Sequence, residues 1–110
     1  MAFCAQFTAE GEANSEKIYR WIAERSPDGA ERWKTALEQA VSRIVDSADT
    51  YGSAPESDAF SEPVREILFK TDKGRKYRAL FVVRGDEASV ISVRGPGQDL
   101  IGPDDVTLPD

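Results

Sequence analysis

A chain of 110 residues suffices for one domain with a single modest core, and its 40% hydrophobic and 31% charged residues are typical of a globular rather than a disordered protein. It has no histidine and one cysteine, Cys4, which excludes an intrachain disulfide, a Cys/His metal site and any imidazole acid–base group. No segment approaches the roughly 20 apolar residues of a membrane span. We therefore expect a cytoplasmic protein with no metal, no cofactor and no membrane partner.

The net charge of −6 is unevenly distributed along the sequence. Residues 65–84 contain seven basic side chains and two acidic ones, whereas residues 96–110 contain four acidic side chains and no basic one. A positive segment in a negative chain is a local field that can steer a macromolecular partner. The alternative is a strand edge that lysine and arginine protect from aggregation.

The first half of the chain is predicted to be helical after one short strand. Residues 3–8 form the strand, and residues 9–25 carry apolar side chains at helical spacing. Gly11 costs this helix about 1 kcal/mol relative to alanine, which leaves its starting point open. Ser26 and Pro27 then end the helix and begin another, because serine caps a helix N-terminus and proline suits its first position.

The second helix is predicted from Pro27 to Ser47. Its apolar residues recur every three or four positions and define one face to be buried: Ala30, Trp33, Leu37, Ala40, Val41, Ile44 and Ala48. The connection between the helices is so short that they must form an antiparallel hairpin. We expect Trp21 and Trp33 to lie in the core at the closed end of this hairpin rather than to form a ligand platform.

The second half is predicted to be a loop, three strands and a tail. Glycine, proline, serine and aspartate mark residues 49–63 as loop, and strands follow at 64–70, 77–84 and 88–94. The middle strand is apolar on both faces and should be central. The fold class is therefore α+β: an N-terminal strand and an antiparallel two-helix hairpin packed on a curved antiparallel sheet. Residues 1–100 form the single domain, and 101–110 a loosely held acidic tail.

Several stretches of the sequence, taken in order, resemble the RelE/ParE family of toxins from bacterial type II toxin–antitoxin modules. The resemblance covers about residues 3–100. It is carried by Phe7-Thr8-Ala9-Glu10, Ile18 to Pro27, Ala30-Glu31-Arg32-Trp33, Ala54-Pro55-Glu56-Ser57-Asp58, Val64-Arg65-Glu66-Ile67-Leu68-Phe69, Lys76-Tyr77-Arg78-Ala79-Leu80-Phe81, and Val90-Ile91-Ser92-Val93-Arg94-Gly95 with Gln98-Asp99.

The resemblance implies one of two activities. RelE-like members cut mRNA on the ribosome with basic side chains and often a tyrosine or histidine near the C-terminus, whereas ParE-like members lack that set and poison DNA gyrase. Arg78 matches the arginine that holds the scissile phosphate in the nucleases, although ParE-like members also carry an arginine there, which bridges the sheet and the C-terminal segment. Where the nucleases place a second arginine, this chain has Gly95-Pro96-Gly97, and no tyrosine follows Tyr77.

We therefore interpret the chain as the toxin of a plasmid-stabilisation module that inhibits growth through DNA gyrase in the ParE manner and is neutralised by a cognate antitoxin. The first alternative is a ribosome-dependent mRNA endoribonuclease that uses Arg78, Arg65 and Glu66, and the second is a non-toxic protein-interaction domain. The residues expected to contact the antitoxin or the target are Arg65, Lys70, Lys73, Arg75, Lys76, Arg78 and Arg94.

Overall fold

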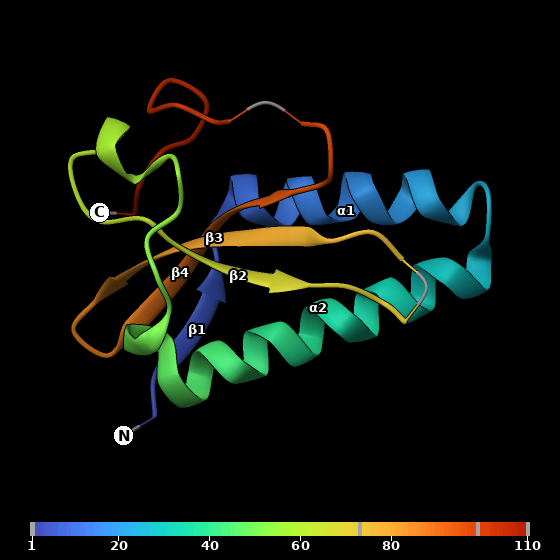
Figure 1. Ribbon diagram of the computed structural model, residues 1–110, viewed down its shortest axis with the longest axis horizontal. Helices are drawn as coiled ribbons and strands as arrows, with labels where there is room; N and C mark the ends of the chain where they lie inside the picture. Colours follow the sequence, from blue (N-terminus) through green and yellow to red (C-terminus); the bar gives the residue numbers. More distant parts are fainter. Residues whose placement is uncertain (1, 73, 99, 110) are drawn as a thin grey trace.

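The computed structural model describes residues 2–72, 74–98 and 100–109. The chain runs through β1 (Cys4–Phe7), α1 (Ala9–Ala23), α2 (Pro27–Ser47), two short 3₁₀ turns (Ala48–Thr50 and Ser57–Ala59), β2 (Arg65–Phe69), β3 (Tyr77–Arg84) and β4 (Glu87–Arg94). The four strands form one sheet in the order β1-β4-β3-β2 (Figure 1). The α+β class, the helical hairpin and the central position of β3 are confirmed. In the described part of the chain, no helix is both long and apolar enough to cross a membrane.

The sheet is mixed, because β1 lies parallel to β4 while the other neighbouring strands are antiparallel. The expectation of an antiparallel sheet thus holds for β2, β3 and β4 but needs correction for β1. A parallel partner requires a long crossover connection. The whole helical hairpin and the first two strands of the meander lie between β1 and β4, so the chain has room to return in the same direction.

Side-chain caps fix the start of each helix, and the cap at Ser26 is the one that the sequence predicts. The Thr8 hydroxyl accepts a hydrogen bond from the Gly11 N–H (3.1 Å), and the Ser26 hydroxyl accepts one from the Gly29 N–H (3.0 Å). Each cap satisfies one of the N–H groups that a helix leaves unpaired in its first turn. The second helix has the predicted bounds, Pro27 to Ser47.

The helices cover one face of the sheet. On α2, Trp33, Leu37 and Ile44 are buried against strand residues such as Ala79 and Phe81. The expectation that Trp21 shares this core is wrong, because its side chain is 55% exposed. On α1 it is Ile18 and Ile22 that pack against this core, whereas Trp21 lies at the side of the hairpin.

The loop before β2 and the C-terminal segment cover the opposite face. Leu80 and Val82 of β3 are fully buried there, beneath Ala54 and Val64. Ile101 is only 5% exposed in the same cluster, so the segment expected to be loosely held packs on the sheet. A central strand that is apolar on both faces needs a cover on each, and this segment supplies part of the second one.

Gly11 allows α1 to lie directly against β4. The Thr8 N–H donates to the Val90 carbonyl (3.0 Å), which brings the first turn of α1 to the point where the pairing of β3 and β4 shifts register. A Cβ atom at position 11 would lie 2.3 Å from the Val90 oxygen. The glycine that weakens the helix in the sequence is therefore required by the contact between helix and strand.

We predict that Gly11→Ala destabilises the protein by about 1–3 kcal/mol, the usual cost of overpacking, although alanine favours a helix more than glycine does. Chemical denaturation monitored by circular dichroism measures the free energy of unfolding. Gly52→Ala is the matched control, since a Cβ atom there meets nothing within 4 Å. Equal stabilities for the two variants would contradict the close approach of α1 to β4.

Candidate functional site

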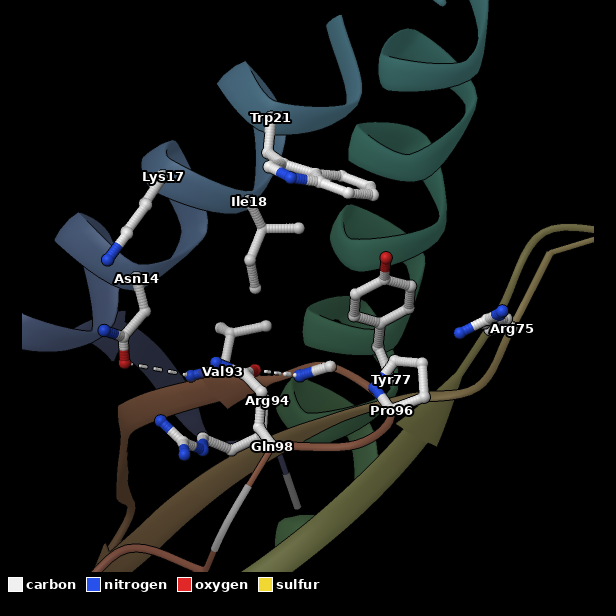
Figure 2. Close-up of a pocket in the computed structure, with 11 residues that line it drawn as sticks. Asn14, Lys17, Ile18, Trp21, Arg75, Tyr77, Val93, Arg94, Pro96 and Gln98 are labelled. Carbon is white, nitrogen blue, oxygen red and sulfur yellow. Dashed lines mark hydrogen bonds between the residues drawn. The ribbon is translucent and has the colours of Figure 1, made fainter. Parts of the chain in front are cut away.

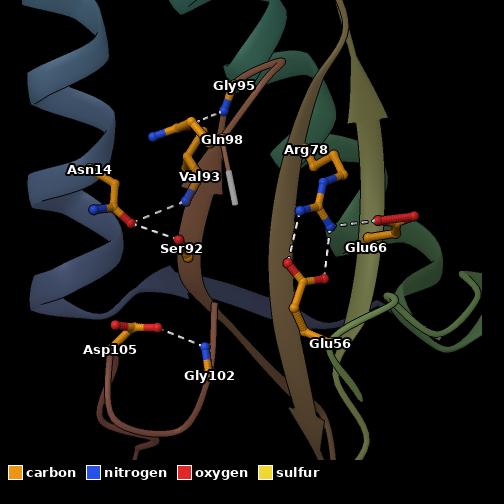
Figure 3. A network of polar contacts seen from close by, with 10 residues as sticks. All are labelled: Asn14, Glu56, Glu66, Arg78, Ser92, Val93, Gly95, Gln98, Gly102 and Asp105. Carbon is orange, nitrogen blue, oxygen red and sulfur yellow. Dashed lines mark hydrogen bonds and ion pairs between the residues drawn. The ribbon is translucent and has the colours of Figure 1, made fainter. Parts of the chain in front are cut away.

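Arg78, the residue that the resemblance singles out, is held by two carboxylates (Figure 3). Its Nη1 and Nη2 atoms donate to Oε1 and Oε2 of Glu56 at 2.9 and 2.8 Å, which makes the pair bidentate. Nη1 also donates to Oε1 of Glu66 at 3.1 Å. Bidentate arginine–carboxylate pairs are among the strongest hydrogen-bonded pairs in proteins. The guanidinium therefore faces two anions of its own chain.

Glu56 is the buried partner of this network, with only 3% of its surface exposed. Burial raises the pKa of its carboxyl, but hydrogen bonds from Arg78 and from the backbone at Glu56 and Ile101 outweigh that effect, so the net pKa is lowered. The pKa of Arg78 is raised, chiefly by its hydrogen bond to Glu56 and further by Glu66. The pair is therefore fully charged at neutral pH, and it joins the loop, the sheet and the C-terminal segment.

The three candidate nuclease residues do not share one site. Arg65 and Glu66 are successive strand residues, whose side chains point to opposite faces of the sheet. Arg65 donates through Nη1 to the carbonyl oxygens of Asp49 (3.4 Å) and Tyr51, whereas Glu66 joins Arg78. The structure thus brings Glu66 and Arg78 together and uses Arg65 to fix the loop that follows α2.

The basic segment 65–84 is neutralised in part by such internal contacts. Besides Arg65 and Arg78, Arg84 forms a bidentate pair with Glu62 (3.0 and 2.6 Å) and donates to the Pro109 carbonyl. The side chains of Lys70, Arg75 and Lys76 are exposed, while Lys73 lies outside the described residues. Lys70, Arg75 and Lys76 therefore present positive charge to solvent, while Arg84 is exposed but paired with Glu62.

A groove of about 630 Å³ lies between α1, the start of β3 and the end of β4 (Figure 2). We call it the basic groove. Its lining residues are Asn14, Lys17, Ile18, Trp21, Arg75, Tyr77, Val93, Arg94, Gly95, Pro96 and Gln98. Two residues of the expected contact set, Arg75 and Arg94, line it on opposite sides, and Lys17 of α1 lines it as well (Figure 2). No acidic side chain is among the described residues that line it.

Polar contacts and aromatic packing fix the walls of the basic groove. The Asn14 Oδ1 atom accepts hydrogen bonds from the Ser92 hydroxyl (2.8 Å) and the Val93 N–H (3.4 Å), which attaches α1 to the edge of β4 beyond the end of β1. The Tyr77 ring packs edge-on against Trp33 (5.7 Å between ring centroids) and stacks on Phe69 (5.8 Å). These contacts hold the floor of the groove in place.

Trp21 presents the large apolar surface of the groove. The guanidinium of Arg25 lies over its ring at 3.8 Å, and Arg25 Nη1 donates to the Trp21 carbonyl (2.7 Å), so the indole is held in place while it remains exposed. The hydroxyl of Tyr77 points towards it across the groove (Figure 2). From the sequence, Lys17 is not selected and Trp21 is expected in the core. The available signal was their spacing of four, which places both on one side of the helix beside the apolar stripe.

This arrangement offers side chains that are suited to binding. The basic groove offers cations, amides and aromatic rings, and the Arg78 network is closed by its own carboxylates. Within residues 2–72, 74–98 and 100–109, no group of three or more cysteine, aspartate or glutamate side chains could hold a metal ion.

We predict that the Arg78–Glu56 pair contributes stability that acid removes. Because the pKa of folded Glu56 lies below its ordinary value of 4.5, this contribution is complete above pH 4.5 and is lost as the pH falls through the folded pKa. Glu56→Gln should lower the free energy of unfolding at pH 7 by about 3 kcal/mol, since one partner of a buried pair is removed. Denaturant titrations between pH 3 and 7 measure both effects.

The control for this experiment is Glu38→Gln on the exposed surface of α2, which should leave the stability at pH 7 and its decline in acid as in the unaltered protein. The Glu56→Gln variant should show a smaller decline below pH 4.5. A Glu56→Gln protein as stable as the control at pH 7 would show that the pair does not hold the loop on the sheet.

Comparisons with known proteins agree with this architecture. The family model for the ParE toxin of the type II toxin–antitoxin system parDE matches residues 5–100. A solved structure described as the chromosomal ParDE TA system from P. aeruginosa shares the fold, with a TM-score of 0.65 and 18% sequence identity over 86% of this chain and 96% of that chain. No curated protein matches the sequence significantly. The chain belongs to the ParE toxin family of type II toxin–antitoxin systems.

Proposed function

We propose that this ParE-family toxin inhibits growth by binding DNA gyrase, and that a cognate antitoxin neutralises it by occupying its basic surface. The observation that carries the proposal is that carboxylates of the same chain already occupy the Arg78 guanidinium. Its guanidinium is paired with Glu56 and Glu66, and the chain has no histidine that could transfer a proton beside it. A toxin with this geometry acts through contact with another macromolecule rather than through bond cleavage.

A ribonuclease needs catalytic groups that this arrangement of side chains does not supply. Cleavage by 2′-OH attack requires a proton acceptor, a proton donor and charge stabilisation. Apart from the buried Glu56, the carboxylate in contact with Arg78 is Glu66, and it already accepts a hydrogen bond from that arginine. At the end of β4, Gly95, Pro96 and Gly97 offer no ionisable side chain. These features favour the gyrase poison over the endoribonuclease.

The contact surface of the proposal combines basic residues that line the basic groove or are exposed to solvent. Arg75 and Arg94 line the basic groove, and Lys70 and Lys76 are exposed in the connection between β2 and β3, to which Arg75 also belongs. Lys73, which lies outside the described residues, belongs to the same turn in the sequence. Binding energy spread over several such side chains should fall in steps as they are replaced one at a time.

The expected result is that the purified protein inhibits supercoiling of relaxed plasmid by gyrase and leaves ribosome-bound mRNA uncut in primer-extension assays. Arg75→Ala or Arg94→Ala should weaken the inhibition partially, and the exposed α2 residue Arg43 serves for the control variant Arg43→Ala. Codon-positioned cuts that disappear in a folded Arg78→Lys variant would instead establish the endoribonuclease. A protein that does neither and does not slow growth would be a non-toxic interaction domain.

A further inference from the structure

The C-terminal segment consists of an anchor and a part that is attached loosely. Ile101 is the anchor, because its side chain is buried and its backbone forms a hydrogen bond with the Glu56 carboxylate. None of residues 102–109, all of which the structure describes, is fully buried, and they form no helix or strand. We call residues 103–109 the flap. The flap lies beyond residue 100, where the match to the ParE family model ends.

The flap follows the outer face of the central strand. Just before its start, the chain is held at the carboxylate that pairs with Arg78, near the beginning of β3. At its end, the Pro109 carbonyl accepts a hydrogen bond from Arg84, the last residue of β3. Alternate residues of a strand share one face, so Leu80 and Val82 lie between these two points. We call these two buried residues the apolar strip.

Two apolar side chains attach the flap to this strip. Val106 and Leu108 pack against the cluster that contains the strip, and both remain partly exposed. A groove of about 690 Å³ borders the flap beside Phe60 of the loop before β2 (Figure 1), and another of about 330 Å³ borders it beside Ser92 of β4. Side chains beside a groove make fewer contacts than those in a close-packed core. Opening the flap therefore gives up little packing.

The hydrogen bonds of the flap also permit it to move. The Gly102 N–H donates to Oδ2 of Asp105 (2.8 Å), and the Asp105 N–H donates to the Gly102 carbonyl (3.0 Å), so this turn stays intact when the flap moves. Arg84 is also held by its bidentate pair with Glu62 and keeps its place when Pro109 leaves it. Segments with few buried apolar contacts open at a free energy well below that of global unfolding.

We propose that the flap is a conformational gate, which opens about Gly102 while the rest of the domain stays folded and which masks the apolar strip when closed. Apolar surface on an exposed sheet is a site of association with other chains. The closed flap therefore keeps this face of the sheet from contact with other proteins, whereas the basic groove beside α1 is open to solvent. The gate does not depend on which target the toxin has.

Thiol labelling of the full-length chain tests the gate, in a Cys4→Ser background because Cys4 is exposed. Val82→Cys places a thiol under the flap, and the matched Val90→Cys places one under the helices; both valines are buried and they lie on adjacent strands. We expect Val82→Cys to react at least about 100-fold faster, with little dependence on urea, because only Val90→Cys requires global unfolding. Equal rates with the same steep dependence on urea would overturn the proposal.

A second pair of variants assigns the opening to the flap rather than to the loop before β2. Arg84→Met removes the contacts with both Pro109 and Glu62, whereas Glu62→Gln removes the ion pair and leaves the Pro109 contact. Labelling of Val82→Cys should accelerate about 2- to 10-fold in Arg84→Met, the effect of one hydrogen bond, and stay unchanged in Glu62→Gln. Equal acceleration in both variants would show that the loop opens instead.

Dye binding tests whether the flap masks an apolar surface. Val106→Ser with Leu108→Ser should hold the flap open, so that the folded double variant binds 1-anilinonaphthalene-8-sulfonate and keeps its far-ultraviolet circular dichroism. Thr107→Ser, at an exposed position of the flap, is the control and should not bind the dye. A folded double variant that binds no dye would show that the flap masks nothing. A double variant that loses its circular dichroism would show that the segment belongs to the core and is no gate.

Discussion

The bidentate pair between Arg78 and Glu56 is the interaction on which the arrangement of this molecule depends. It joins the central strand to a loop that has little regular structure of its own, and the Ile101 backbone bonds to the same carboxylate. Two charges this deeply placed are costly unless both are paired, so breaking one side costs about 3–5 kcal/mol. Arg84 and Glu62 repeat the design near the far end of the strand. The loop and the C-terminal segment are thus fixed on one face of the sheet, and that face is closed.

The hairpin side of the sheet carries the basic groove. There the contact of Gly11 with Val90 and the hydrogen bonds of Asn14 attach α1 to the edge of β4. The basic groove lies between this helix, the start of β3 and the end of β4. Arg78, which could hold a phosphate if it were unpaired, instead forms structural ion pairs. Arg94, opposite it in the strand pairing, lines the groove. The two opposed arginines thus differ in place: Arg78 belongs to a structural network and Arg94 to the lining of the groove.

Local rules predicted much of the fold. The bounds of α2 follow from the Ser26 cap, Pro27 and an unbroken apolar stripe, and the central position of β3 follows from its apolar faces. Pairings between residues far apart in the sequence could not be read in this way. Nothing in the loop sequence marks Glu56 as the partner of Arg78, and Gly11 looked like a weakness because Val90, which explains it, is 79 residues away. Trp21 was misplaced because apolar character predicts burial only on average, and the hairpin ends beside a groove rather than in the core.

The central claim is that Arg78 acts through structure and that toxicity acts through contact. Its most direct test is the double variant Glu56→Gln with Arg78→Met, which removes both charges of the buried pair together, a change that is often close to neutral for stability. The measurement is inhibition of gyrase supercoiling by the folded double variant. The account predicts inhibition equal to that of the unaltered protein. A large loss of inhibition from a double variant that is still folded would contradict it.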